Sequence, residues 1–392
     1  MRVLAVAPQP FFSSRGTPLS VYYRTLVMAE QGAEVDVLTY GVGKEIDVRG
    51  VRVLRIPRIR ILEPVPIGPS WRKLLLDVLM VLWTIGLLLR NRYQAVDAHE
   101  EAVFWCRFLK PVFRFKLIYD MHSSLPQQLT NFEFTKSRLL IGAFRWLEDT
   151  SLATADIVIA VCPDLRDYAL KVGTAPAKVH LIENSIFEDV RVRVPSSAAG
   201  NGAVQEPVRF GPGQRVILYA GTFEVYQGVE LLVEAFARVS RELPEARLLL
   251  VGGSAAQVRK VEALVHFHGL GDRCVLTGHL PRRAAADYTR SADVLVSPRI
   301  HGTNTPLKIY EHLASGRPMV ATAIWSHTQV LDESVCRLVE PDPASLARGL
   351  VDALTDEAGS RARIERALEL FRREYARPVY ERKVRRLLES LA

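Results

Sequence analysis

The chain has 392 residues, 48% of them hydrophobic, and this length exceeds what one ordinary hydrophobic core supports. The formal net charge of +8 favours an anionic partner, which can be nucleic acid, an anionic lipid surface or a phosphorylated substrate. The four scattered cysteines form no C-x-x-C pair, which argues against a disulfide framework or a zinc site and indicates reduced thiols in a cytosolic protein.

Short apolar strands alternate with helical stretches along the whole chain. The first strand follows Met1 in an apolar run that is too short for a signal-peptide core, so export is not expected. In the first half, strands are predicted at residues 2–7, 34–40, 51–56, 95–98, 116–120, 157–161 and 179–182. In the second half, they are predicted at residues 216–220, 247–251, 274–277, 294–297, 318–321 and 337–339. This alternation predicts two doubly wound, Rossmann-like α/β domains with parallel sheets.

Residues 74–89 form an almost wholly apolar stretch that only Asp77 interrupts. As a helix it would reach about 24 Å at roughly 1.5 Å per residue, which is shorter than a bilayer core. Two interpretations remain open: a helix buried against the parallel sheet, or a helix that dips into the membrane interface. Basic residues beside an apolar helix favour an anionic lipid surface, and this stretch is flanked by Arg52, Arg55, Arg58, Arg60, Arg72, Lys73, Arg90 and Arg92.

A linker is predicted between the two halves, because residues 195–207 are small, polar and rich in turn formers. We therefore predict an N-terminal domain over residues 1–186, a linker over 187–214 and a C-terminal domain over 215–376. After Pro378, apolar residues recur at helical spacing among arginines and lysine, which predicts an amphipathic helix over residues 377–392. That helix either packs on its own domain or crosses back to the first one.

The loop after the first strand ends in Gly16-Thr17-Pro18 before a helical run. Gly16 permits close approach of a ligand to the backbone, and the N–H groups of a helix start attract phosphate. The same residues also fit a plain strand-to-helix turn. No G-x-G-x-x-G follows this strand, and the chain contains no G-x-x-x-x-G-K-[ST], which argues against a dinucleotide dehydrogenase and a P-loop NTPase.

A second polar segment, Asp120-Met121-His122, stands at the carboxyl end of a predicted strand, where open α/β sheets bind ligands. His122 can donate to a sugar hydroxyl or move a proton near neutral pH, and Asp120 can orient it. A structural histidine is the alternative. Basic residues elsewhere are dispersed and no aromatic-basic platform occurs, so nucleic-acid binding is not expected.

The third segment opens from a buried strand at residues 294–297 into a polar loop, and Pro306 starts a helix that ends at Gly316. Lys308 and Glu311 are one turn apart on this helix. The helix N-terminus can receive a diphosphate, Lys308 adds a positive charge, and Glu311 can accept hydrogen bonds from ribose hydroxyls. A surface ion pair between the two side chains is the alternative.

These segments together resemble retaining glycosyltransferases of family four, which have the GT-B fold, and the similarity covers nearly the full chain. The segment at Asp120 resembles the acceptor-side loop, and Asn184 resembles the asparagine that opens the interdomain crossover. Residues 219–228 resemble the donor loop, and 249–253 the glycine turn of the next strand. Residues 311–318 match the closing signature. The resemblance implies an acceptor-binding first domain, a nucleotide-sugar-binding second domain, and a cleft between them.

By this resemblance the catalytic residues are His122, Asp120, Lys308 and Glu311. The donor-binding residues are Gly16, Thr17, Gly221, Thr222, Gln227, Gly252, Arg299, Thr303, Asn304, Thr305 and Leu307. Two departures stand out: Thr222 and Gln227 replace the usual arginine and lysine of the donor loop, and Thr303 replaces the first glutamate of the E-x-seven-E pattern. Lys308 and Arg299 are expected to supply the missing charge.

The resemblance further implies transfer with retention, without metal or cofactor, in which the leaving diphosphate acts as base for the incoming hydroxyl. The expected partners are a nucleotide diphosphate sugar, a lipid-linked or glycan acceptor, and an anionic membrane that the protein contacts peripherally on its cytoplasmic, inner face. Glycolipid, lipid-linked glycan and exopolysaccharide synthesis are all compatible. Two alternatives remain: a sugar-nucleotide epimerase on the same fold, and a noncatalytic sugar-nucleotide-binding protein at the membrane surface.

Overall fold

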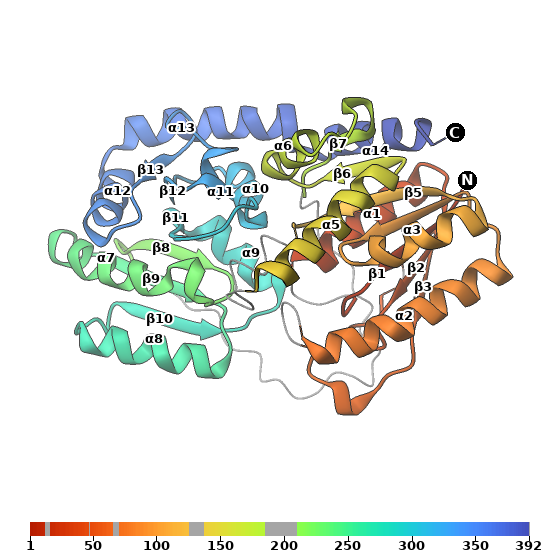
Figure 1. The fold of residues 1–392 in the computed structure, drawn as a ribbon. Coiled ribbons are helices and arrows are strands. Elements are labelled where there is room, and N and C mark those ends of the chain that lie inside the picture. The colour runs from red at the N-terminus through yellow and green to blue at the C-terminus, as the bar shows by residue number, and fades with distance from the viewer. Residues whose placement is uncertain (12–15, 47, 66–69, 125–136, 185–209, 392) are drawn as a thin grey trace. The chain divides into compact units, whose positions relative to one another are not determined.

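A computed structural model describes residues 1–11, 16–46, 48–65, 70–124, 137–184 and 210–391. The chain divides into two compact units (Figure 1). The first contains Met1–Gly200 together with Arg377–Ala392, and the second contains Asn201–Ala376. The C-terminal residues therefore belong to the first unit and not to the unit that they follow in sequence.

Over the described residues of the first unit, seven strands form one parallel sheet in the order β3-β2-β1-β4-β5-β6-β7. Most of these strands are buried on both faces, which explains their continuous apolar runs in the sequence. Every predicted strand of this half is present, to within one residue at either end. The bounds are β1 Arg2–Ala7, β2 Glu34–Thr39, β3 Val51–Arg55, β4 Ala95–His99, β5 Lys116–Met121, β6 Ile157–Ala160 and β7 Val179–Leu181.

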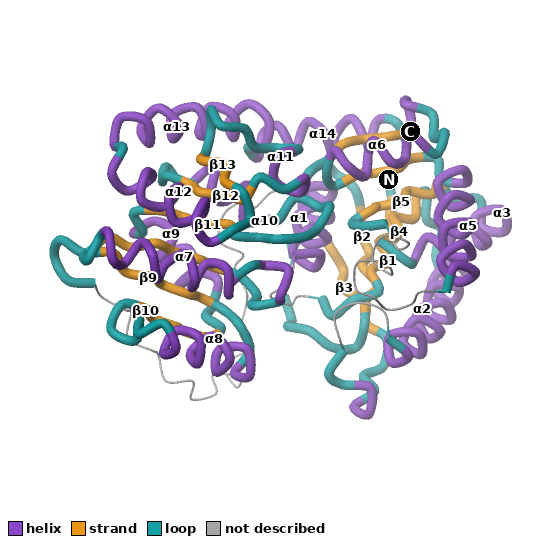
Figure 2. The backbone as a smooth tube through the Cα atoms, turned by 60° about the vertical axis from the view of Figure 1, so that its left-hand side comes forward, coloured by secondary structure: helices purple, strands orange, loops and turns teal. Residues whose placement is uncertain are grey.

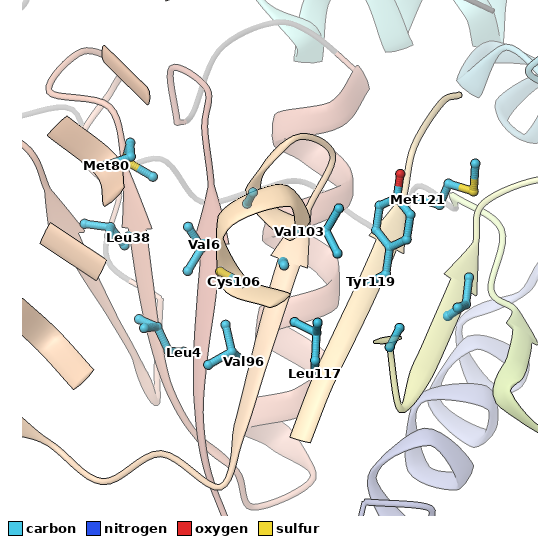
Figure 3. Close-up of a cluster of buried hydrophobic side chains, with 14 of the residues drawn as sticks. Leu4, Val6, Leu38, Met80, Val96, Val103, Cys106, Leu117, Tyr119 and Met121 are labelled. Carbon is cyan, nitrogen blue, oxygen red and sulfur yellow. The ribbon is translucent and has the colours of Figure 1, made fainter. Parts of the chain in front are cut away.

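Alternate side chains of each strand point to opposite faces of the sheet, so a continuously apolar strand makes both faces apolar. Helices cover both faces of this first sheet. The helices are α1 Gly16–Glu30, α2 Trp71–Arg90, α3 Ala102–Phe113, α5 Arg138–Thr154, α6 Pro163–Lys171 and α14 Arg377–Glu389, with 3-10 turns η1 Arg60–Leu62 and η2 Pro176–Lys178. On one face, Leu4 and Val6 of β1 belong to a buried cluster that also contains residues of α2, α3, α5 and α6 (Figure 3). The other face packs Val3 and Ala5 against α1 and α14.

The C-terminal helix α14 is held on the first unit by both apolar and polar contacts. Tyr380, Val384 and Leu387 lie in the same buried cluster as α1. The Tyr380 hydroxyl accepts a hydrogen bond of 3.0 Å from Nε of the buried Arg24, and Lys383 forms an ion pair with Glu183. The apolar stripe predicted for this helix thus docks on the first sheet.

Helix α2 is buried along one narrow stripe only. Ser70 caps its start by accepting from the backbone N–H of Lys73, and Leu76, Met80, Thr84 and Leu88, each four residues apart, pack on the sheet. Of the two interpretations of residues 74–89, packing against the parallel sheet holds for this one side of the helix, whereas Leu74, Val78 and Leu82 on the remaining surface are exposed. Among the described residues, none of the helices is both long and apolar enough to cross a bilayer.

Across residues 210–376 the second unit forms a six-stranded parallel sheet in the order β10-β9-β8-β11-β12-β13. Its strands are β8 Arg215–Ala220, β9 Ala246–Val251, β10 Cys274–Gly278, β11 Val294–Ser297, β12 Met319–Thr322 and β13 Arg337–Val339. Its helices are α7 Val229–Glu242, α8 Ala255–Phe267, α9 Arg282–Ser291, α10 Leu307–Ala314, α11 Trp325–Thr328, α12 Pro343–Thr355 and α13 Glu357–Leu370, with a 3-10 turn η4 Val225–Gln227 and a π-helical turn η5 Phe371–Tyr375. The prediction of two doubly wound parallel-sheet domains is confirmed.

Candidate functional site

Each sheet has one point where the strand order reverses, and doubly wound sheets bind ligands outside the carboxyl ends of the strands at that point. In the second unit the reversal lies between β8 and β11. Gly221 and Thr222 follow the end of β8, whereas Pro298 begins the loop that leads from β11 to α10. In the first unit the reversal lies between β1 and β4, which places the carboxyl ends of these two strands beside each other.

Two predicted donor-site glycines of the second unit lie where the chain has no room for a side chain. A Cβ atom on Gly252 would stand 1.8 Å from the carbonyl oxygen of Gly221, and Gly252 has a φ of +125°. A Cβ atom on Gly221 would stand 2.7 Å from the Lys308 Nζ atom. Position 252 thus requires glycine, and at Gly221 the backbone after β8 lies next to the lysine of α10.

Lys308 lies on the first turn of α10, with its ammonium group turned toward the donor loop. Its Nζ atom is 3.4 Å from the Gln227 side-chain oxygen and 3.9 Å from the centre of the Tyr219 ring. Burial, and after it the positive charge of Arg299, lower the pKa of Lys308 to about 7, against the opposing effect of Glu311. A bound anion would favour the protonated form, so this lysine is suited to bind a diphosphate.

The loop before α10 is ordered by contacts to its own backbone. Arg299 donates to the carbonyl oxygens of His301, at 2.7 Å, and Asn304, at 2.8 Å, and its guanidinium lies over the Tyr226 ring. Burial lowers the pKa of Arg299. Because these donors hold the loop, Arg299 shapes the start of α10 as well as adding charge there.

The remaining predicted residues of this loop lie beside Arg299 and Lys308. The carbonyl oxygen of Thr303 accepts a hydrogen bond of 2.6 Å from Gln329. The Thr305 hydroxyl oxygen is buried and has no hydrogen-bond partner within the described residues. Leu307 is the first residue of α10. Thr222 offers its carbonyl oxygen to the Tyr219 hydroxyl at 2.6 Å, so this backbone group is already occupied.

Glu311 makes an ion pair that the sequence did not predict. Its carboxylate lies 3.0 Å from the guanidinium of Arg282, the first residue of α9. Burial raises the pKa of Glu311, whereas Arg282 and Lys308 oppose that rise. Arg282 therefore brings another cation to this end of the second sheet. The pair joins two helices far apart in the sequence, and no local motif marks it.

In the first unit, Asp120 and His122 lie in a wholly buried cluster that also contains His99, at the end of β4. The His99 Nδ1 atom is 3.0 Å from His122 Nε2 and 3.4 Å from Asp120 Oδ2, and His122 Nε2 is 3.5 Å from Asp120 Oδ1. Asp97 lies 3.3 Å from the other nitrogen of His99. Sequence reasoning missed His99, although its place at the end of a central strand could have indicated it.

The charges in this cluster assign different roles to the two histidines. Burial lowers the pKa of His122 to about 3, so its imidazole is neutral at physiological pH. Burial also disfavours the charged form of His99, but Asp97 and Asp120 outweigh this effect and raise its pKa. Burial would raise the pKa of Asp120, but Arg24 and then the two histidines lower it below its ordinary value. Asp120 therefore stays ionised.

The three side chains of this cluster come within the reach of a metal ion. One donor atom from each of His99, Asp120 and His122 lies within 4.8 Å of the others. However, the guanidinium of Arg24 already stands 3.5 Å from Asp120, with both side chains fully buried. This cation supplies the positive charge that a metal would bring. Metal-independent chemistry remains a prediction for this site.

Gly16 and Thr17 are the first residues of α1, whereas the sequence placed them at the end of the preceding loop, part of which lies outside the described residues. A Cβ atom on Gly16 would meet no atom of the described residues within 4 Å, so their packing does not require glycine there. Ser20, which also lies on α1, donates a hydrogen bond to the side chain of Asn184. A ligand-binding role for the start of α1 remains a prediction.

Solved structures contain the same pair of doubly wound sheets. The sucrose-phosphate synthase of Thermosynechococcus elongatus superposes with a TM-score of 0.77 at 22% identity, covering 100% of this chain and 98% of that chain. Anabaena HepE, solved in complex with UDP-glucose, superposes with a TM-score of 0.71 at 13% identity, covering 100% of each chain. The fold is therefore the GT-B fold of glycosyltransferases.

Sequence comparisons identify the family. A family model described as Glycosyltransferase Family 4 matches residues 15–189, and one described as Glycosyl transferases group 1 matches residues 214–356. A D-inositol 3-phosphate glycosyltransferase of Xylanimonas cellulosilytica is 31% identical over 224 residues, which are 55% of this chain and 52% of that enzyme. A phosphatidylinositol N-acetylglucosaminyltransferase component of Arabidopsis thaliana is 24% identical over 382 residues, 91% of this chain and 74% of that protein. The chain belongs to glycosyltransferase family four.

The two curated relatives differ in how much of their length the match includes. The chain spans about half the length of the Xylanimonas enzyme and about three quarters of the Arabidopsis protein.

Proposed function

We propose that this protein transfers a sugar from a nucleotide diphosphate donor to an acceptor hydroxyl, and that the second unit binds the donor. The observation that carries the proposal is the position of Lys308. Its ammonium lies at the start of α10, beside the backbone of Gly221 and the side chain of Gln227 in the donor loop. The complex of HepE with UDP-glucose, which shares the fold, supports a nucleotide sugar as the donor.

The second unit stabilises the negative charge that develops on the departing diphosphate. The backbone N–H groups at the start of α10 and the Lys308 ammonium both act on this charge without reorganisation, and such preorganised donors contribute strongly to catalysis. Arg299 keeps the loop in place. The Glu311 carboxylate, held by Arg282 at 3.0 Å, accepts hydrogen bonds from ribose hydroxyls. With no arginine and lysine at positions 222 and 227, Lys308 becomes the principal cation for the diphosphate.

The first unit supplies His122 to the transferred sugar and the acceptor. Because its pKa is lowered to about 3, the neutral ring offers one N–H donor and one acceptor nitrogen. The ionised Asp120 and the nearby His99 fix the orientation of the ring. We further propose transfer with retention and without metal, in which the departing diphosphate takes the proton of the acceptor hydroxyl.

The acceptor is proposed to be a glycolipid or a lipid-linked glycan, presented at an anionic membrane surface on the cytoplasmic side. The Arabidopsis relative is part of a phosphatidylinositol glycosyltransferase, which supports a lipid acceptor. Helices α2, α3 and α5 lie next to one another on one face of the first sheet (Figure 2). Together they expose Trp71, Leu74, Leu75, Val78, Leu82, Trp83, Leu89, Phe108, Val112, Leu139 and Trp146, which we call the apolar face.

The apolar face fits a peripheral membrane contact better than ordinary solvent exposure. Soluble proteins seldom expose several large apolar side chains in one continuous area. An amphipathic helix with tryptophans on its apolar side lies in the interface plane and does not cross the bilayer, and nearby cations strengthen its binding to anionic lipid. We expect the protein to bind anionic vesicles at low salt and to leave them as the salt concentration rises.

Two measurements test this function. Purified protein is mixed with a panel of nucleotide sugars, and the donor is identified by the largest rise in melting temperature, since ligands that bind the native state stabilise it. Lys308→Met should abolish the rise, whereas Lys260→Met on α8, an exposed lysine of the same unit, should retain it. Release of the nucleotide diphosphate from that donor, without acceptor and with it, separates a transferase from a noncatalytic binding protein. No stabilisation by any nucleotide sugar would refute the proposal.

A further inference from the structure

An open pocket of about 480 Å³ lies at the amino-terminal end of the strands of the first sheet, where β5 begins. The ends of α3 and α5 and the start of β5 form its walls. It is lined by Arg107, Lys110, Pro111, Arg114, Phe115, Lys116, Thr154 and Asp156. Four of these side chains are cationic and only one is a carboxylate, so the pocket is suited to an anion.

Only part of this positive charge is used inside the protein. Lys110 lies 2.8 Å from Asp156 and donates to the carbonyl oxygen of Thr154 at 2.8 Å, which neutralises one cation. Arg114 and Lys116 are exposed, and neither side chain has an ion pair or a hydrogen bond within the described part of the chain. The buried Arg107 donates from Nη1 to the Thr150 hydroxyl and to the carbonyl oxygen of Leu147, whereas its Nε atom has no acceptor among the described residues.

The position of the pocket separates it from the proposed catalytic residues. Lys116 begins β5, whereas Asp120 stands near its carboxyl end. Four residues of strand separate them by about 13 Å, at roughly 3.3 Å per residue. Doubly wound sheets bind their substrates at the carboxyl ends of the strands. A pocket at the amino ends of the strands therefore serves another purpose.

The pocket adjoins the apolar face through Arg107. The guanidinium of Arg107 lies 4.4 Å from the centre of the Phe108 ring and 5.2 Å from that of the Trp146 ring. Both rings belong to the apolar face and are more than half exposed, at 63% and 60%. Aromatic side chains next to cations are typical of the level of lipid headgroups in a membrane.

From this arrangement we propose that the pocket binds the phosphate of an anionic lipid headgroup. Arg114 and Lys116 contact the phosphate oxygens, and the acyl chains lie along Phe108 and Trp146. A free phosphate would occupy the cationic part alone and leave the exposed rings uncovered. The inference deepens the proposed membrane contact and rests on it, because it names the chemical group that anchors the first unit.

The test replaces the two exposed cations and measures sedimentation with vesicles. The variant is Arg114→Asn with Lys116→Gln, because asparagine tolerates the φ of +59° at residue 114. Vesicles of phosphatidylcholine carry equal surface charge from either phosphatidic acid or oleate. Each basic residue near an anionic surface contributes roughly fivefold in partition, so losing two should weaken binding to phosphatidic acid vesicles about 25-fold. The wild-type protein should bind phosphatidic acid vesicles more tightly than oleate vesicles, and the variant should bind the two equally.

A matched control separates this site from general charge. Arg361→Gln with Arg366→Gln removes two exposed arginines of α13, on the other unit, and should change partition less than threefold. Equal losses in both double variants would overturn the headgroup site. Tight binding of inorganic phosphate to the wild-type protein, with vesicle partition unchanged in the pocket variant, would assign the pocket to a soluble ligand and also overturn it. An unchanged melting temperature verifies that the pocket variant is folded.

A third variant distinguishes failure of the pocket from failure of the membrane contact. Leu74→Gln with Leu82→Gln alters the apolar face on α2 without changing charge. If this variant leaves the vesicles while the pocket variant stays bound, the membrane contact stands and the headgroup site is wrong. If the wild-type protein binds no anionic vesicle, both proposals fail.

Discussion

Donor binding should be coupled to protonation of Lys308. In the free protein, burial and Arg299 lower the pKa of this lysine to about 7, from an ordinary value of 10.5. A bound diphosphate would favour the ammonium form and raise the pKa again. Binding therefore takes up a proton between about pH 7 and the higher pKa of the complex, and donor affinity should fall as the pH rises through that range.

The size of this effect follows from the two pKa values. If the diphosphate restores the pKa to near 10.5, affinity should decrease about 30-fold between pH 6 and pH 8.5. A nucleotide sugar is the suitable probe, because its diphosphate is esterified at both ends and has no proton to lose in this range. A free nucleoside diphosphate would add the titration of its own terminal phosphate.

Isothermal titration calorimetry measures both consequences. Affinity is recorded across this pH range, and repetition in buffers of different ionisation enthalpy counts the protons taken up. Lys308→Met should bind weakly and with no pH dependence, whereas Lys260→Met should behave like the wild-type protein. If wild-type affinity is constant over the range, or if Lys308→Met retains the same slope, the assignment of Lys308 to the diphosphate is refuted.

Four further outcomes are expected. His122→Ala should lower the turnover number about 10²-fold and leave donor affinity nearly unchanged, as steady-state kinetics and calorimetry would show; weaker affinity at normal turnover would contradict its role. Glu311→Ala should reduce turnover more than tenfold in a folded protein, and normal activity would place the ribose contact elsewhere. Gly252→Ala should lower the melting temperature and donor affinity together, because a Cβ atom cannot fit 1.8 Å from the Gly221 oxygen; a variant equal to wild type would show that the backbone there can shift. Partition onto anionic vesicles should fall steeply with salt, and equal recovery in the supernatant with neutral and anionic lipid at low salt would exclude the membrane contact.

The sequence was sufficient to locate the strands of both sheets, to within one residue. Strands that are buried on both faces must be continuously apolar, and the loops between them carry glycine, proline and polar residues, so the alternation is visible locally. Pro306 before α10 and Gly316 after it mark the ends of a single helix in the same way. Lys308 could be selected from the sequence as a diphosphate-binding residue, because it follows Pro306 by two positions and so lies on the first turn of the helix.

Helix α2 shows where local pattern was insufficient. Its apolar residues surround the helix on most sides, so hydrophobic periodicity does not distinguish the stripe at Leu76 and Met80 from the exposed side at Leu74 and Leu82. Only packing on the sheet decides which side is covered. The exposed remainder of α2, together with α3 and α5, became recognisable as one surface once the three helices were placed side by side.

The charged contacts of the site were decided by tertiary structure alone. Glu311 pairs with Arg282 of another helix, and His99 reaches His122 because β4 and β5 are neighbours in the sheet. Pairs so distant in the chain have no sequence spacing that marks them. The lowered pKa of Lys308 likewise arises from burial and from Arg299 on the preceding loop, and removal from water is a property of the folded protein. The sequence thus determined the residue types and the order of the strands along the chain, whereas the fold determined which charges meet and how strongly each one holds its proton.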